Sequence, residues 1–145
     1  MTPGAHSLAR ILLLTAVLLI PAGARDVPRF RGATPLEWSV KLADSEMART
    51  GDQHFFGGSN PRARIDYTTS FFGTALVRLA DRTGKAAYAD YGLKFGTSFV
   101  AADGSIRTYQ REDYNIDNIP PGKVLLLAWE RGDRSPALKQ AIDTL

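Results

Sequence analysis

Cysteine is absent from the 145-residue chain, and histidine occurs only as His6 and His54. The lack of cysteine excludes a disulfide framework, Cys-ligated zinc, a thiol nucleophile and a lipidated N-terminal cysteine. Two histidines are too few for most histidine-based metal sites. We therefore expect no metal or organic cofactor, and any chemistry must come from carboxylates, hydroxyls, amides and aromatic rings.

Dense runs of basic residues are also lacking. The chain has 18 Lys+Arg against 15 Asp+Glu, a formal net charge of +3, and the basic residues are spread along its length. Nucleic-acid binding is not expected, because such proteins cluster their positive charge along the phosphate backbone. A hydrophobic content of 44% and a charged content of 23% are typical of one globular domain.

The one long apolar run lies near the N-terminus. Arg10 precedes residues 11–20, which only Thr15 interrupts, and the sequence Pro-Ala-Gly-Ala follows at residues 21–24. This pattern predicts a secretory signal peptide over residues 1–24. The alternative is a membrane anchor, but the run is about half of the roughly 20 residues that span a bilayer. The mature protein is expected to be secreted or periplasmic, without membrane attachment.

Residues 25–34 form a leader rich in proline, arginine and glycine, and residues 35–145 predict helices joined by polar turns. Pro35 suits the first position of a helix, Gly84 suits the position just past one, and Ser135-Pro136 combines a polar cap with a first-position proline. A short extended stretch is predicted at residues 105–109. The predicted helices cover about residues 35–49, 67–82, 85–100, 120–131 and 136–145.

Aromatic residues form a stripe on the third predicted helix, at positions 88, 91, 95 and 99. This spacing indicates one helix face, which serves either as a ligand platform or as a packed seam between helices. The seam is the preferred interpretation.

The turn sequences repeat. Arg-Thr-Gly-Lys at residues 82–85 and Arg-Gly-Asp-Arg at residues 131–134 begin 49 positions apart, each between a leucine-rich helix and a more polar one. A helix-pair period near 50 residues is typical of a helical array, either an open solenoid or a closed toroid. The chain holds about two and a half such pairs and stops inside a predicted helix. It is therefore expected to be a truncated part of a longer array.

Residues 114–126, Tyr-Asn-Ile-Asp-Asn-Ile-Pro-Pro-Gly-Lys-Val-Leu-Leu, are the most informative segment. Together with Trp-Ser-Val-Lys-Leu-Ala-Asp-Ser at residues 38–45 and Asp-Tyr-Thr-Thr at residues 66–69, this segment resembles glycoside hydrolase families 88 and 105. These are the unsaturated glucuronyl and rhamnogalacturonyl hydrolases, and the likeness is closer to the second. The resemblance implies an all-α fold, a partial (α/α)6 toroid whose active site lies at the concave end.

The resemblance also implies a substrate and a reaction. The substrate is an unsaturated uronic-acid oligosaccharide, left when a lyase cuts a pectin-like polysaccharide. An aspartic acid protonates C4 of the C4=C5 double bond and helps water attack C5, and the resulting hemiketal opens to release the next sugar. Protonating carbon near neutral pH needs a carboxyl group kept protonated by neighbouring carboxylates or apolar burial.

Asp117 matches the aspartate of the family's Tyr-Asn-Ile-Asp block. The resemblance gives it the role of a supporting carboxylate, which tunes the acid and orients water. The alternative is that Asp117 caps the following helix. A proline at the first helical position, Pro120 or Pro121, would place that cap later, so the active-site role is favoured.

Three further residues are candidates for substrate binding. Tyr67 matches the tyrosine of the family's Trp-x-Tyr signature and either lines the sugar site or belongs to the core. Ile65 stands where that signature has tryptophan, which leaves the sugar preference open. Asn115 and Asn118 either hydrogen-bond sugar hydroxyls or form turns, and the turn role ranks first.

Two residues receive no chemical role. Gly122 is expected to allow close helix approach, and Asp143 is expected to be a solvated helical carboxylate. The family's principal acid/base aspartate follows a Gly-Gly-Phe-Trp-like segment that this sequence lacks, so the 145 residues are expected to be inactive by themselves. The alternatives are an exported helical module that binds a carbohydrate or protein, and a structural fragment without a function of its own.

Overall fold

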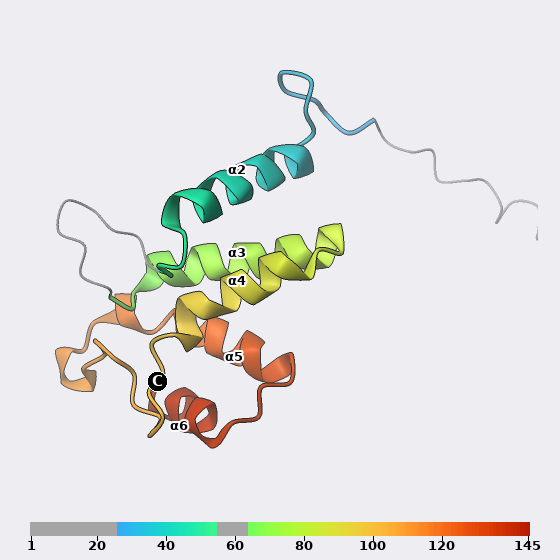
Figure 1. Cartoon of the computed structure of the whole chain (residues 1–145). Helices are drawn as coiled ribbons and strands as arrows, with labels where there is room; N and C mark the ends of the chain where they lie inside the picture. Colours follow the sequence, from blue (N-terminus) through green and yellow to red (C-terminus); the bar gives the residue numbers. More distant parts are fainter. Residues whose placement is uncertain (1–25, 55–63) are drawn as a thin grey trace, which may run out of the picture. The chain divides into compact units, whose positions relative to one another are not determined.

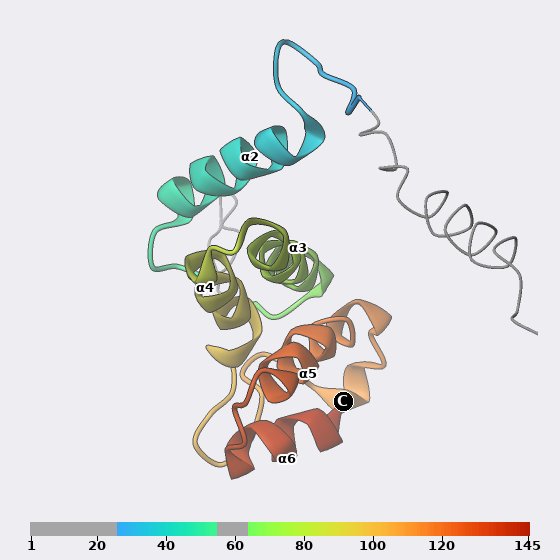
Figure 2. The same ribbon diagram turned by 90° about the vertical axis from the view of Figure 1, so that its right-hand side faces the viewer.

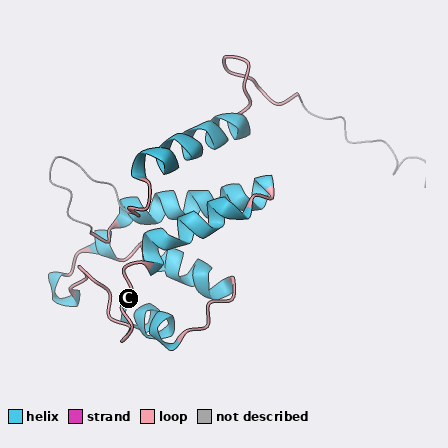
Figure 3. Ribbon diagram, in the orientation of Figure 1, coloured by secondary structure: helices cyan, strands magenta, loops and turns pink. Residues whose placement is uncertain are grey.

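A computed structural model describes residues 26–54 and 64–145 (Figure 1). Over these residues the regular secondary structure is helical, with two isolated β-bridges and no strand (Figure 3). The predicted all-α class is therefore confirmed. The elements are α2 (Pro35–Thr50), α3 (Tyr67–Thr83), α4 (Ala86–Thr97), the 3-10 turns η1 (Arg111–Asp113) and η2 (Ile116–Asn118), α5 (Gly122–Glu130) and α6 (Pro136–Thr144).

The chain divides into two units, Met1–Pro35 and Leu36–Leu145. The predicted signal peptide lies outside the described residues. None of the helices within the described ranges is long and apolar enough to cross a membrane. The described part of the first unit contains a tight turn, in which Phe30 and Ala33 exchange backbone hydrogen bonds of 2.9 and 3.1 Å. Arg31 and Gly32 form its corner with φ of 48° and 77°, the left-handed geometry of a two-residue hairpin turn.

Local capping signals set several helix ends. The Asp66 side chain accepts from the backbone N–H groups of Thr68 and Thr69, which satisfies two donors that the first turn of α3 would otherwise leave unpaired. Gly84 ends α3 with φ of 71°, as its position in the sequence predicts. The Ser135 hydroxyl accepts from Leu138 N–H at 3.3 Å and begins α6, which confirms the Ser-Pro signal.

Helices α3 and α4 form one hairpin, and α5 and α6 form the next. The turns that close the two hairpins lie beside each other, because Arg131 pairs with Asp81 across 50 positions of sequence. With α2, these elements make two and a half hairpins (Figure 2). The repeated turn sequences therefore mark equivalent ends of stacked hairpins, as the period of about 50 residues predicts.

Glycines allow the α3–α4 contact. A Cβ atom at Gly92 would lie 2.7 Å from the Gly73 carbonyl oxygen, and one at Gly73 would lie 2.7 Å from the Gly92 oxygen. Gly96 plays the same part against Val124 of α5. The sequence had indicated Gly122 for this role. A Cβ there would meet only the Leu145 side chain, so the close approach of helix backbones occurs at the other glycines.

The hydrophobic core has two clusters. One lies between α2, α3 and α4 and includes Ala43, Leu76 and Tyr88, while the other joins α5 and α6 to Ile65 and Phe99. The aromatic stripe of α4 is a packed seam, as preferred from the sequence, since its residues at positions 88, 95 and 99 are buried. The helix itself stops at Thr97 rather than near residue 100, because the chain turns there.

Two tyrosines of α4 form hydrogen bonds that hold α2 and the turn after it. The Tyr88 hydroxyl donates to Asp44 at 2.7 Å, and this hydrogen bond, with burial as a smaller cause, raises the pKa of Tyr88. The Tyr91 hydroxyl lies 2.6 Å from the Thr50 hydroxyl and 2.6 Å from the Gly51 carbonyl oxygen. Side-chain hydrogen bonds therefore supplement the apolar contacts that hold α2 on α4.

The imidazole of His54 packs beside this junction, with its centroid 4.8 Å from the Tyr91 ring and 5.8 Å from the Phe95 ring. Its Nε2 atom is buried and has no hydrogen-bond partner among the described residues. Desolvation, followed by the charge of Lys94, lowers the pKa of His54, although Asp52 opposes this. The fold therefore favours the neutral imidazole.

This environment predicts a pH dependence of stability. The unfolded chain binds a proton on His54 more readily than the folded chain does. The contribution of His54 to the free energy of unfolding is thus complete above its unfolded pKa of about 6.5 and is lost as the pH falls through the lower folded pKa. Urea unfolding midpoints at about pH 7.5 and about pH 5.5 should show a smaller acid loss for His54→Phe than for the wild type. Equal losses would contradict the prediction.

Candidate active site

The N-terminal ends of α3 and α5 meet at one end of the hairpin stack. The Ser70 hydroxyl, in the first turn of α3, donates to the Pro120 carbonyl oxygen at 2.8 Å. Thr108 makes a second link, since its hydroxyl accepts from Ile65 N–H at 2.9 Å. The loop from Thr108 to Pro120 is therefore anchored at both of its ends to the start of α3, and we name this segment the clamped loop.

Asp117 lies in the clamped loop, inside η2. The Asn115 side-chain oxygen accepts from Asp117 N–H at 3.0 Å and orders this turn. The Asp117 side chain is exposed, and no hydrogen bond or ion pair reaches its carboxylate from the parts of the chain that the structure describes. Pro121 occupies the cap position of α5, so Asp117 does not cap that helix. Its carboxylate is free to meet a ligand.

The two asparagines of the clamped loop, Asn115 and Asn118, differ in the environment of their side chains. Asn115 uses its side-chain oxygen to form the turn at Asp117, which is the role that ranked first from the sequence. Asn118 is 1% exposed, and its side-chain oxygen is buried without a hydrogen-bond partner in the described chain. In this structure Asn118 has no surface to offer a sugar, so its position supports packing within the clamped loop rather than direct substrate contact.

Tyr67 begins α3 and is 42% exposed, so it is not a core residue. Its ring lies edge-on to Phe71, with centroids 6.1 Å apart, and Phe71 is itself 67% exposed. Ile65, at the signature's tryptophan position, is fully buried in the second core cluster. This position therefore contributes packing and no stacking surface, which leaves Tyr67 and Phe71 as the exposed rings at the start of α3.

A groove with a volume of about 310 Å³ runs along the clamped loop, and its lining includes Asn115 and Ile116, the two residues that precede Asp117 in the chain. It combines aromatic, amide and guanidinium groups with an apolar wall, a set that suits a sugar ring and its hydroxyls. Its lining residues are Tyr109, Gln110, Arg111, Tyr114, Asn115, Ile116, Ile119 and Leu145. The sequence had not indicated Arg111, and it had indicated Tyr114 only as the first residue of the Tyr-Asn-Ile-Asp block, without a role of its own.

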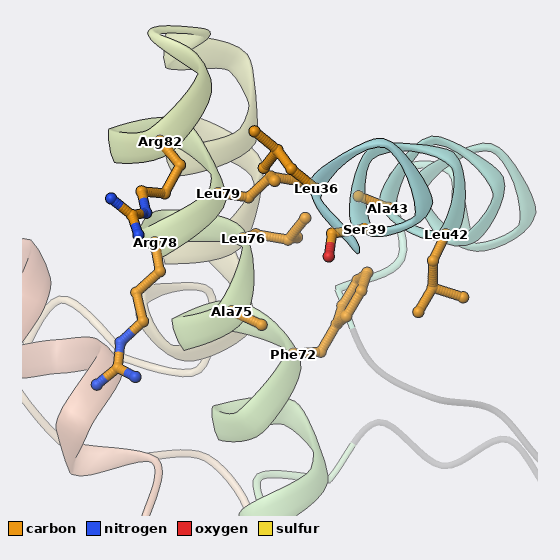
Figure 4. A pocket seen from close by; sticks show the side chains of 10 residues that line it. All are labelled: Leu36, Ser39, Leu42, Ala43, Phe72, Ala75, Leu76, Arg78, Leu79 and Arg82. Atoms are coloured by element: carbon orange, nitrogen blue, oxygen red, sulfur yellow. The ribbon is translucent and has the colours of Figure 1, made fainter. Parts of the chain in front are cut away.

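Another groove, of about 360 Å³, lies between α2 and α3 (Figure 4). Its wall is apolar apart from Ser39 and the side chains of Arg78 and Arg82, and none of the described residues that line it is acidic. It therefore offers no carboxyl group for acid–base chemistry. Asp143 offers none either, because it lies on α6 in an exposed ion pair with Lys139, as expected from the sequence.

These features define an all-helical hairpin protein with an accessible carboxylate where two successive hairpins begin. The family model described as Glycosyl Hydrolase Family 88 matches residues 38–145. The chain therefore belongs to glycosyl hydrolase family 88, a six-hairpin glycosidase family, which confirms the resemblance to family 88 found in the sequence. The closer likeness to family 105 stays a prediction. The family acts on unsaturated uronides, so the substrate is a carbohydrate. Comparisons with curated proteins and with solved structures gave no match.

Proposed function

We propose that this chain supplies the Asp117 part of a site that hydrates the C4=C5 double bond of a terminal unsaturated uronic acid. The substrate would be an oligosaccharide released by a lyase from a pectin-like polysaccharide. One observation carries the proposal: an exposed carboxylate with no hydrogen-bond or ion-pair partner among the described residues lies on a loop clamped to the start of α3, the helix that begins with the exposed Tyr67. Membership of the family supports this substrate class.

In the proposed reaction a proton adds to C4 and the oxygen of water bonds to C5, so that the double bond is consumed. The C5 hemiketal then opens to a C5 ketone as the C5–O5 bond breaks, which leaves a hemiacetal at C1. That hemiacetal collapses to an aldehyde, and the next sugar leaves as the C1–O bond breaks and the glycosidic oxygen takes up a proton. Asp117 would accept a hydrogen bond from a sugar hydroxyl or from the attacking water and so orient it. Export after cleavage at Ala24 is part of the proposal, since lyase products of plant-wall polysaccharides form outside the cell.

The acid that protonates C4 is not assigned to this chain. Keeping a carboxyl group protonated near neutral pH takes a second carboxylate in contact or apolar burial. Asp117 is exposed, and within residues 26–54 and 64–145 no interaction joins it to another acidic group. The geometry supports substrate binding and orientation by Asp117 and does not supply the proton donor.

Residues 25–145, purified by themselves, are therefore expected to bind an unsaturated disaccharide without consuming it. Ultraviolet absorbance of the C4=C5 double bond should stay constant over hours, while titration followed by nuclear magnetic resonance shows saturable shifts. The shifts should include the side-chain amide of Asn115, which lies beside Asp117. Steady loss of absorbance above the buffer rate would refute the proposed division of roles.

An exported binding module is the second candidate. The exposed rings of Tyr67, Phe71 and Tyr114 favour it, because aromatic surfaces also bind sugars without chemistry. The two candidates differ in what they recognise. A site shaped for the double bond should bind the unsaturated disaccharide more tightly than its saturated counterpart, whereas equal affinity for both would favour the binding module.

A further inference from the structure

Tyr114 has a conformation that its own residue type disfavours. It is 92% exposed and closes η1 with φ of 47° and ψ of 33°, where its N–H donates to the Arg111 carbonyl oxygen at 3.2 Å. A residue with a Cβ atom adopts this left-handed region at a cost, and such residues concentrate where function maintains them. The backbone strain at Tyr114 must therefore be offset by some other contribution of this side chain.

The stability of the fold does not explain why a tyrosine occupies this position. At 92% exposure the ring buries almost no surface, and its hydroxyl has no hydrogen-bond partner in the described part of the chain. Glycine or asparagine would occupy this corner with less strain. A tyrosine here gives the isolated fold little, so the ring is better explained by something that binds against it.

The position of Tyr114 is also fixed relative to Asp117. Both lie in the clamped loop, whose ends are tied to α3 by the bonds from Ile65 to Thr108 and from Ser70 to Pro120. Thr108 is itself left-handed, with φ of 68°, although it is β-branched. Two strained residues and two long-range bonds thus set the path of one loop, which is the arrangement expected of a preorganised binding surface.

We propose that Tyr114 stacks on a pyranose ring of the oligosaccharide bound at Asp117, and that the groove of about 310 Å³ is the subsite for that ring. A pyranose has an apolar face of C–H groups and an edge of hydroxyls. The tyrosine ring covers the face, and the side chains of Gln110 and Asn115 in the same groove meet the edge. This inference rests on the proposed function and adds a binding residue to it.

The test is Tyr114→Gly, which separates stability from binding. Glycine adopts the left-handed corner freely, so the thermal midpoint should stay the same or rise. Affinity for the unsaturated disaccharide should fall about fivefold, because the ring is gone. Tyr114→Asn, which also tolerates this backbone, should behave in the same way, and Tyr114→Phe should keep wild-type affinity. Phe30→Ala, which removes a 66% exposed ring of the first unit that is not among the groove's lining residues, serves as the control.

The outcomes are distinct. Saturable wild-type binding with a loss confined to the glycine and asparagine variants supports stacking at Tyr114. Saturable wild-type binding that both variants retain overturns the stacking role and leaves the proposed function standing. Absence of wild-type binding overturns both. A glycine variant with a clearly lower thermal midpoint would show that the ring serves the fold, which also contradicts the inference.

Discussion

Replacing Gly92 by alanine is expected to separate α3 from α4 and to lower the free energy of unfolding by about 2 kcal/mol or more. The new Cβ would lie 2.7 Å from the Gly73 carbonyl oxygen and 2.8 Å from Leu76 Cβ. The first neighbour is backbone, so relief requires the helices to move apart. Alanine gains roughly 1 kcal/mol over glycine in a helix interior, which is less than the roughly 3 kcal/mol cost of severe overpacking.

Gly122→Ala is the matched control. Gly122 is also helical, but a Cβ there meets only the Leu145 side chain, with its terminal carbon at 3.0 Å. That flexible group can turn aside, so helix propensity should dominate and stability should be unchanged or higher. Urea unfolding followed by circular dichroism measures both variants. A Gly92→Ala midpoint at or above the wild-type value would show that the two helices do not cross as closely as the structure places them.

Structural features that depend only on residues adjacent in the chain were predictable from the sequence. The glycine past α3 and the Ser-Pro start of α6 act within one turn of chain, so residue type alone indicated them. The stripe on α4 likewise marked a buried face. It did not identify the helix that packs against that face. The contact between Gly73 and Gly92 was missed because glycine inside a helix ordinarily indicates only a low helix propensity.

The candidate site was predictable to the same degree. Asp117 was indicated by its sequence block, and it lies exposed in η2 rather than at the cap of α5, while its active-site role stays a prediction. The clamped loop was not foreseeable, since its anchoring bonds join residues 43 and 50 positions apart. Whether a loop asparagine faces outward or inward depends on that path. Asn118 faces inward for this reason, whereas Tyr114 is held outward by a backbone conformation that its type does not favour.

Asp117→Ala is expected to weaken binding of the unsaturated disaccharide about tenfold or more. A hydrogen bond from a sugar hydroxyl to a carboxylate contributes roughly 1.5–3 kcal/mol, and about 1.4 kcal/mol corresponds to a tenfold change in affinity. Asp117→Asn keeps an acceptor oxygen but loses the charge, so its loss should be smaller. Neither change should alter the thermal midpoint, because the described chain places no partner on the exposed carboxylate.

The direction of the expected change in affinity makes this prediction specific for a direct contact at Asp117. The substrate carries a carboxylate, so removing any negative charge from the protein should strengthen attraction slightly, and more at low salt. Asp143→Ala measures that general effect, since Asp143 is an exposed carboxylate on α6 paired only with Lys139. A direct contact at Asp117 must therefore outweigh an opposing electrostatic gain. Wild-type affinity in Asp117→Ala, or an equal loss in Asp143→Ala, would remove Asp117 from the site.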